Sequence, residues 1–179
     1  YRAGVGAIDL KACHGYLMVD LLSARARKKS IYGGEEPSNR FRFLLETVEG
    51  IKNEIPGMIV TMRLSLWDGY QGGFGVGENN GEDYTEPVML IEELIKRDVR
   101  MINVTMGSPY FNPHVTRPYD TPVPGAAVPE EHPLKGVMRM IDGTSFVQKR
   151  FPEVIFIGSA YSYLRQYAPN TGAEVIKAG

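Results

Sequence analysis

The sequence of 179 residues lacks several features that would assign it to a particular class of protein. Its single cysteine excludes an internal disulfide framework, and also a zinc or iron–sulfur site built only from cysteines of this chain. No apolar run approaches the roughly 20 residues that a membrane span needs, and Tyr1–Gly6 does not have the pattern of a signal peptide. These absences predict no membrane partner and favour the reducing environment of the cytoplasm.

An excess of one charge is also missing. The chain has 20 Lys and Arg residues and 21 Asp and Glu residues, which gives a formal net charge of -1. Without a basic excess, the composition gives no indication of a nucleic-acid partner. The remaining composition, 43% hydrophobic and 23% charged, is typical of a globular chain that buries a core.

Chemically active side chains follow the first predicted strand. Apolar and polar residues alternate over positions 7–12 with the two-residue period of a strand, and Gly15 ends the pattern. Lys11, His14 and Tyr16 therefore fall at or just beyond the C-terminal end of this strand. Parallel α/β folds carry their chemistry at that end of the sheet, so these three residues are the candidate catalytic residues.

The rest of the chain repeats this strand-then-helix plan. Helical apolar spacing predicts a helix that Asn39 caps and Pro56-Gly57 ends. The dense apolar run Met58 to Leu66 predicts a strand that is buried on both faces, as in a parallel sheet. The later elements are expected as a helix from Thr85, a strand over Met101 to Met106, a helix over Val137 to Val147, a strand over Glu153 to Ile157 and a helix over Ala173 to Lys177.

The lengths of the connections indicate the architecture. Helix-to-strand connections are short, whereas strand-to-helix connections such as residues 67–84 and 107–133 are long and rich in Gly or Pro. Because parallel strands all point the same way, every long loop is expected at one end of the sheet, as in a (β/α) barrel enzyme. The glycines of Gly73-Phe-Gly75-Val-Gly77 lack the spacing of a phosphate-binding loop, so no such loop is predicted there.

Four strand-helix units make half of a barrel, because eight units normally take about 250 residues. The segment Tyr1–Gly4 resembles the last turn of a helix, and Gly179 is a residue type that ends helices. The predicted fold is therefore α/β: a partial (β/α)8 TIM barrel with parallel strands. We expect residues 1–179 to form one such domain, an internal segment of a longer protein truncated at both ends.

A set of short motifs has the order and spacing of a known family. The motifs are Lys11-Ala-Cys-His-Gly-Tyr16, Leu21-Leu22-Ser23, Tyr32-Gly33-Gly34, Asn39-Arg40-Phe41-Arg42-Phe43 and Arg63-Leu64-Ser65, followed by a less specific match through Ile157 to Ala160. Together they resemble the Old Yellow Enzyme family of FMN-dependent NAD(P)H:flavin oxidoreductases and ene-reductases. The resemblance covers essentially the whole chain, as the fourth to seventh units of that family's barrel.

The resemblance implies a role for each matching residue. Tyr16 would protonate the substrate carbon next to the one that receives hydride from reduced flavin, which is general acid catalysis. His14 would donate a hydrogen bond to the substrate's carbonyl or phenolate oxygen, where negative charge grows. Arg63 would lie beside the pyrimidine edge of the flavin and stabilise its reduced, anionic form.

The implied cofactor is FMN, with NADH or NADPH as the reductant and a small molecule such as an activated alkene as the acceptor. The family binds the FMN phosphate after its seventh and eighth strands, and this chain contains only the seventh-strand part. That part consists of Gly158, Ser159 and Ala160.

Two departures from the family pattern modify these expectations. Lys11 stands where the family usually has a histidine, and a lysine can donate hydrogen bonds but cannot accept them. Between Gly34 and Asn39 the chain is one residue longer than the common pattern, and Ser38 replaces the usual Glu. We therefore expect Arg40 to lock this loop through an ion pair rather than to act in catalysis.

Two alternatives stay open. Lys11 could form a Schiff base, as in barrel lyases, which requires an amine that burial or cationic neighbours keep neutral. The chain could also be a catalytically silent half-barrel that only folds or self-associates, because a half-barrel has two open sheet edges. For the isolated segment we expect weak FMN binding or none.

Overall fold

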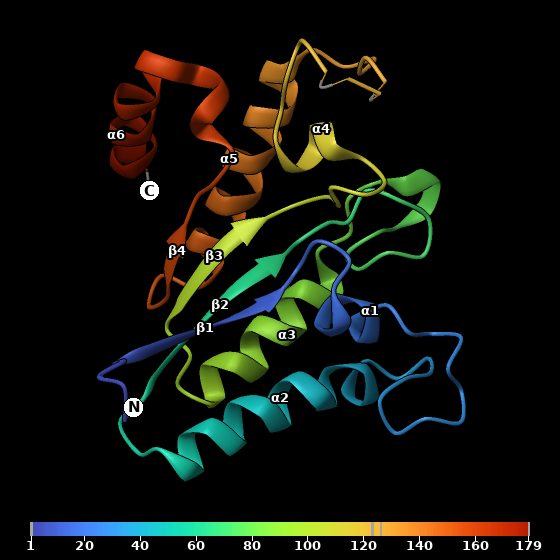
Figure 1. Ribbon diagram of the computed structural model, residues 1–179, viewed down its shortest axis with the longest axis vertical. Helices are drawn as coiled ribbons and strands as arrows, with labels where there is room; N and C mark the ends of the chain where they lie inside the picture. Colours follow the sequence, from blue (N-terminus) through green and yellow to red (C-terminus); the bar gives the residue numbers. More distant parts are fainter. Residues whose placement is uncertain (1, 123, 126, 179) are drawn as a thin grey trace.

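The computed structural model describes residues 2–122, 124–125 and 127–178. Its four strands form one parallel sheet in which sequential strands are neighbours (Figure 1). The strands are β1 (Ala7–Ala12), β2 (Ile59–Ser65), β3 (Met101–Thr105) and β4 (Ile155–Ile157). Sequential parallel strands joined by helical crossovers are the arrangement of a partial (β/α)8 barrel. The fold class predicted from the sequence is thus confirmed.

Helices follow each strand. The long ones are α2 (Pro37–Glu54), α3 (Thr85–Lys96), α5 (Pro133–Arg150) and α6 (Ala168–Ala178). Shorter helices lie within the strand-to-helix connections: α1 (Leu17–Leu22), α4 (Pro113–Thr116) and the 3₁₀ helices η1 (Glu78–Asn80) and η2 (Tyr161–Tyr167). None of the helices in the described ranges combines the length and hydrophobicity that crossing a membrane requires.

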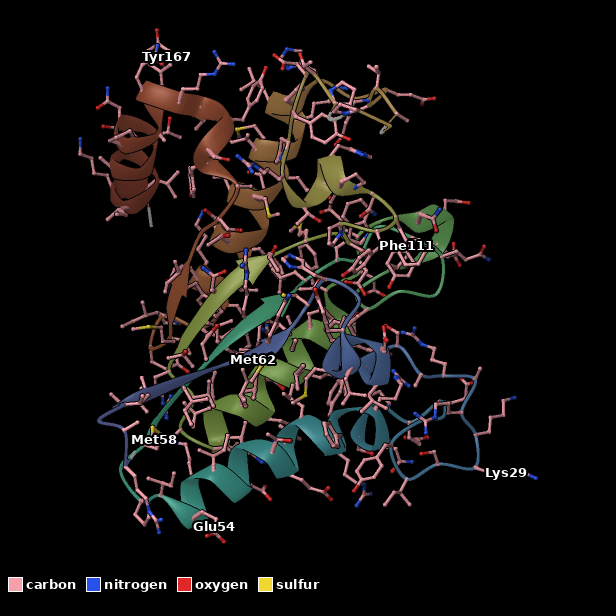
Figure 2. The ribbon with its side chains drawn as sticks, viewed as in Figure 1. Lys29, Glu54, Met58, Met62, Phe111 and Tyr167 are labelled. Atoms are coloured by element: carbon pink, nitrogen blue, oxygen red, sulfur yellow. The ribbon has the colours of Figure 1, made fainter. Side chains whose placement is uncertain are left out.

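One face of the sheet forms the core. Alternate residues of β2 and β3 point to this face, because side chains along a strand alternate between its two sides. Val60, Met62, Leu64, Ile102 and Val104 are almost completely buried there against apolar residues of α2, α3 and α5. Figure 2 labels Met62 within this layer. The core therefore fixes the direction in which the remaining strand residues point.

The opposite face of the sheet is open. Ile59, Met101, Ile155 and Ile157 lie on it and are between 36% and 60% exposed. The expectation that the second strand is buried on both faces is wrong for the described chain, because no second layer among these residues covers this side. In a closed barrel, the face of the sheet away from the helices is the interior.

The two ends of the sheet differ, as the connection lengths predicted. The long loops all leave the C-terminal ends of the strands and gather at one end of the molecule (Figure 1). In Figure 2, Phe111 marks this loop end, and Met58 marks the opposite, plain end. The polar residues that follow the strands are therefore brought to one rim.

Three local predictions differ from the structure. Asn39 does not cap α2 but lies inside it, because the helix begins at Pro37, whose fixed φ suits the first helical turn. Residues 2–4 form a turn rather than a helix end, while Tyr1 and Gly179 lie outside the described residues. The last helix starts at Ala168 instead of Ala173.

Candidate active site

Four predicted site residues lie together at the loop end of β1 and β2. Lys11 and Arg63 are register partners on these adjacent parallel strands, so both side chains leave the open face. His14 and Tyr16 follow within the turn after β1, and both lie close to Lys11. The structure thus brings Lys11, His14, Tyr16 and Arg63 to one rim, while their chemical roles remain predictions.

A left-handed turn sends the two aromatic residues of this group in different directions. His14 and Gly15 have φ values of +64° and +69°, a conformation that is uncommon for a residue with a side chain. The His14 ring is buried, and its Nε2 forms a 3.1 Å hydrogen bond with Thr105 Oγ1 at the end of β3. Tyr16 is 47% exposed. The turn therefore produces one buried imidazole and one accessible phenol.

The buried imidazole of His14 is electrically neutral near pH 7. Burial lowers the pKa of His14 to about 4, and the charges of Arg63 and Lys11 act in the same direction. A neutral imidazole has one N–H donor and one acceptor nitrogen. His14 therefore adds hydrogen-bonding groups to the rim without adding a positive charge.

We expect the His14 imidazole to titrate with a midpoint near pH 4 instead of near 6.5. Between these values the unfolded chain binds more protons than the folded one, so the contribution of His14 to stability is complete above pH 6.5 and is lost as the pH falls towards 4. Carbon-13 histidine NMR can measure the midpoint, because the chain has three histidines and His14→Asn identifies the resonance. A midpoint near 6.5 would contradict the buried, neutral state.

Tyr16 has two close polar neighbours. The Lys11 Nζ lies 3.7 Å from the centroid of the Tyr16 ring, which is a cation–π contact. The Tyr110 hydroxyl donates a hydrogen bond to the Tyr16 hydroxyl, with 3.1 Å between the oxygens. The Lys11 amine therefore packs on the ring face of the candidate proton donor, and the Schiff-base alternative stays a prediction.

Two buried polar atoms on the open face have no hydrogen-bond partner within the described part of the chain. They are Arg63 Nε on β2 and Asn103 Oδ1 on β3, and the two residues are register partners. Unpaired buried polar atoms are costly and call for a physical explanation. A bound group with a hydrogen-bond acceptor and a donor along one edge would satisfy both atoms.

The three residues assigned to the phosphate lie at the same end of the sheet, directly after β4. The Ser159 hydroxyl donates to the Val104 carbonyl oxygen at 2.6 Å, and Ala160 has a left-handed φ of +66°. A Cβ added to Gly158 would lie 2.8 Å from the Tyr161 hydroxyl. Strand β3 separates this segment from β2, so it does not join the group around Arg63, and its phosphate role stays a prediction.

Arg40 has the structural role expected from the sequence. Its completely buried guanidinium forms an ion pair with Glu86 at the start of α3. It also donates hydrogen bonds to the carbonyl oxygens of Leu22, Gly34 and Glu35, at distances of 2.6 to 2.9 Å. The ion pair that locks this loop is thereby confirmed.

Sequence reasoning missed Thr105, Asn103 and Tyr110. Asn103 could have been identified from the sequence, because it is a polar residue in the otherwise apolar middle of β3. Thr105 could also have been identified, because it ends β3 and the ends of parallel strands share a rim. Tyr110 lies within a long proline-rich loop, where spacing alone does not distinguish it from other aromatic residues.

Comparison with known proteins gives one family and several partial relatives. Residues 1–120 match the model of the NADH:flavin oxidoreductase / NADH oxidase family. An NADH-dependent flavin oxidoreductase of Talaromyces variabilis is 38% identical over 66 residues, which are 34% of this chain and 16% of that protein. An NADPH dehydrogenase of Bacillus velezensis is 35% identical over 80 residues, 45% of this chain and 23% of that protein. The matched segments span less than a quarter of either relative.

Proposed function

Because the chain belongs to the NADH:flavin oxidoreductase / NADH oxidase family, we propose that it supplies part of the active site of an FMN-dependent enzyme that reduces activated alkenes or similar acceptors. FMN is the cofactor of this family, with NADH or NADPH as reductant. The observation that carries the proposal is the convergence of Lys11, His14, Tyr16 and Arg63 on the open face. Further strands of the same protein would close the barrel around this face.

The residues on the open face fit the pyrimidine edge of a flavin. This edge carries carbonyl oxygens that accept hydrogen bonds and an N–H that donates one. The unpaired Arg63 Nε and Asn103 Oδ1 have the complementary polarity. Arg63 would also hold a permanent positive charge where a reduced flavin is anionic. When bound, reduced FMN supplies the hydride.

Of the other three residues, His14 and Tyr16 would act on the substrate and Lys11 would act on Tyr16. His14 donates a hydrogen bond to the substrate oxygen, where negative charge grows as the hydride arrives, and this lowers the energy of the transition state. Tyr16 donates its hydroxyl proton to the neighbouring carbon. The Lys11 ammonium beside the Tyr16 ring favours the negative charge that the departing proton leaves on the phenol oxygen.

The proposal is tested on the full-length protein by following the flavin absorbance anaerobically in a stopped-flow instrument. We expect NADH or NADPH to bleach the flavin, and an α,β-unsaturated ketone then to restore the oxidised spectrum. A flavin that oxygen reoxidises but the unsaturated ketone does not would show an oxidase instead, and would contradict alkene reduction.

A second candidate concerns this chain alone, as a silent half-barrel that self-associates. It is favoured by the apolar open face and by the edges of β1 and β4, which have no further strand beside them among the described residues. We expect the purified 179-residue chain to form oligomers in light scattering and to lack stoichiometric FMN. A monodisperse monomer would refute self-association, and stoichiometric flavin would refute weak binding.

A pair of matched variants can show which surface the copies of the chain use to associate. Ile155→Lys combined with Ile157→Lys places charges on the open face and should reduce association, because both side chains are exposed there. Met89→Lys is the control, since Met89 is 42% exposed on α3, a helix that packs on the core face of the sheet. Equal effects of the two changes would exclude the open face as the contact surface.

A further inference from the structure

The loop that follows β3 brings a second phenol to Tyr16. The Tyr110 hydroxyl donates to the Tyr16 hydroxyl oxygen at 3.1 Å, and the two rings meet edge to face with centroids 6.2 Å apart. Tyr110 is 65% exposed. Its hydroxyl therefore contacts the candidate proton donor on one side, while its side chain is open to solvent on the other.

Buried hydrogen bonds anchor the loop around Tyr110. The backbone N–H of Ser108 donates to Asn112 Oδ1 at 2.6 Å, and Asn112 Nδ2 donates to the carbonyl oxygen of Asp68 at 2.8 Å. The next residue, Phe111, packs on Tyr70 with ring centroids 4.6 Å apart. Because residues on both sides are fixed, the backbone position of Tyr110 follows from the fold rather than from a free loop.

Gly15 lies within van der Waals reach of the Tyr110 ring. A Cβ added at Gly15 would lie 3.4 Å from Tyr110 Cδ2 and 3.4 Å from Ser108 Oγ. The turn that carries His14 and Tyr16 and the loop that carries Tyr110 are thus in direct contact. The two phenols meet because two separate segments pack against each other at this point.

We propose that Tyr110 is a positioning residue and proton relay for Tyr16, a role that rests on the proposed proton donation by Tyr16. Since Tyr110 donates to the Tyr16 oxygen, the proton of Tyr16 itself is free to point at a substrate. As the Tyr16 O–H bond breaks and the substrate C–H bond forms, the hydrogen bond from Tyr110 stabilises the negative charge left on the Tyr16 oxygen.

Proton transfer along the same hydrogen bond then returns Tyr16 to its protonated form. The Tyr110 O–H bond breaks, the Tyr16 O–H bond re-forms, and Tyr110 takes a proton from solvent. One solvent proton is consumed for each hydride delivered, so the charges balance over a turnover.

The test compares Tyr110→Phe with wild type in the full-length protein. The phenyl ring keeps the packing on Gly15 while the donor is lost. We expect reoxidation of the flavin by an unsaturated ketone to slow by at least about 10-fold, the value of one hydrogen bond to a charged group. The solvent deuterium isotope effect on this step should rise, because only proton supply is impaired, while reduction by NAD(P)H should be unchanged.

Tyr163→Phe is the matched control, since it removes another exposed tyrosine hydroxyl, the one bonded to Asp120. A readout without turnover is the Tyr16 resonance in carbon-13 tyrosine NMR, assigned with Tyr16→Phe. It should shift in Tyr110→Phe and stay in place in Tyr163→Phe. An unshifted resonance, or a reoxidation rate equal to wild type, would overturn the inference.

The double variant separates this inference from the proposed function. If Tyr110 acts through Tyr16, Tyr16→Phe with Tyr110→Phe should be no slower than Tyr16→Phe alone. A further slowing would show that Tyr110 acts independently, and would overturn the relay while leaving the function intact. An unchanged rate in Tyr16→Phe itself would overturn both the proton donor and the relay.

Discussion

Replacing Tyr16 with phenylalanine in the full-length protein is expected to slow alkene reduction by about 10²- to 10⁴-fold, the usual contribution of a positioned general acid. Reduction of the flavin by NADH or NADPH should proceed at the wild-type rate, because that half-reaction needs no proton from Tyr16. The expected defect is therefore confined to one half of the catalytic cycle, which loss of folding or of cofactor does not produce.

Rapid mixing under anaerobic conditions measures the two half-reactions separately. Tyr32→Phe is a suitable control, since it removes an exposed tyrosine hydroxyl whose hydrogen-bond partner is Glu46 on α2 rather than a residue of the candidate site. If Tyr16→Phe reduced alkenes as fast as this control, another group would have to supply the proton. If both half-reactions slowed together, Tyr16 would support flavin binding instead.

The second large effect is expected at Arg40, where Arg40→Met should destabilise the protein by about 3 to 5 kcal/mol, the cost of breaking a buried ion pair. The change would leave the Glu86 carboxylate with only the partly exposed Arg25 as an ion-pair partner. It would also leave the carbonyl oxygens of Leu22, Gly34 and Glu35 without the donors that Arg40 supplies. The loop between α1 and α2 should then be more mobile, because its remaining ion pair with α3 is the one between Arg25 and Glu86.

Urea unfolding measures the loss of stability, as a lower midpoint at an unchanged slope. Limited trypsin digestion reports on the loop itself, because it contains Arg25, Arg27, Lys28 and Lys29 as cleavage sites. Arg42→Met is the control: Arg42 lies on the same helix, but its hydrogen bonds to Ile31 and Asn39 are exposed. Equal destabilisation by the two changes would contradict the importance of the buried pair.

The sequence was sufficient to predict the architecture and the local part of the site. Strand periodicity and unequal connection lengths are local properties, and parallel pairing then brings all long loops to one end. Lys11, His14 and Tyr16 are within six positions of one another, so their proximity needed only the end of one strand. Arg63 joined them because β2 pairs directly with β1.

Partners distant in sequence could not be predicted in the same way. Thr105 ends β3 and Tyr110 lies in the loop after it, and they meet His14 and Tyr16 across separations of 91 and 94 residues. These contacts depend on the register of three strands and on how one loop packs on another, and neither is encoded in a local pattern. The first residue of α2 was predicted wrongly because Pro37 and Asn39 are both residue types that occur near a helix N-terminus, and the local sequence does not decide between them.

The left-handed backbone at His14 has a consequence for how this chain can change. A side chain in that conformation costs on the order of 1 kcal/mol or more, which glycine would avoid. Glycine would also lose the buried ring and its hydrogen bond to Thr105, so relieving the backbone cost at position 14 removes packing and an imidazole at the same time. Engineering for heat resistance should therefore leave this position untouched.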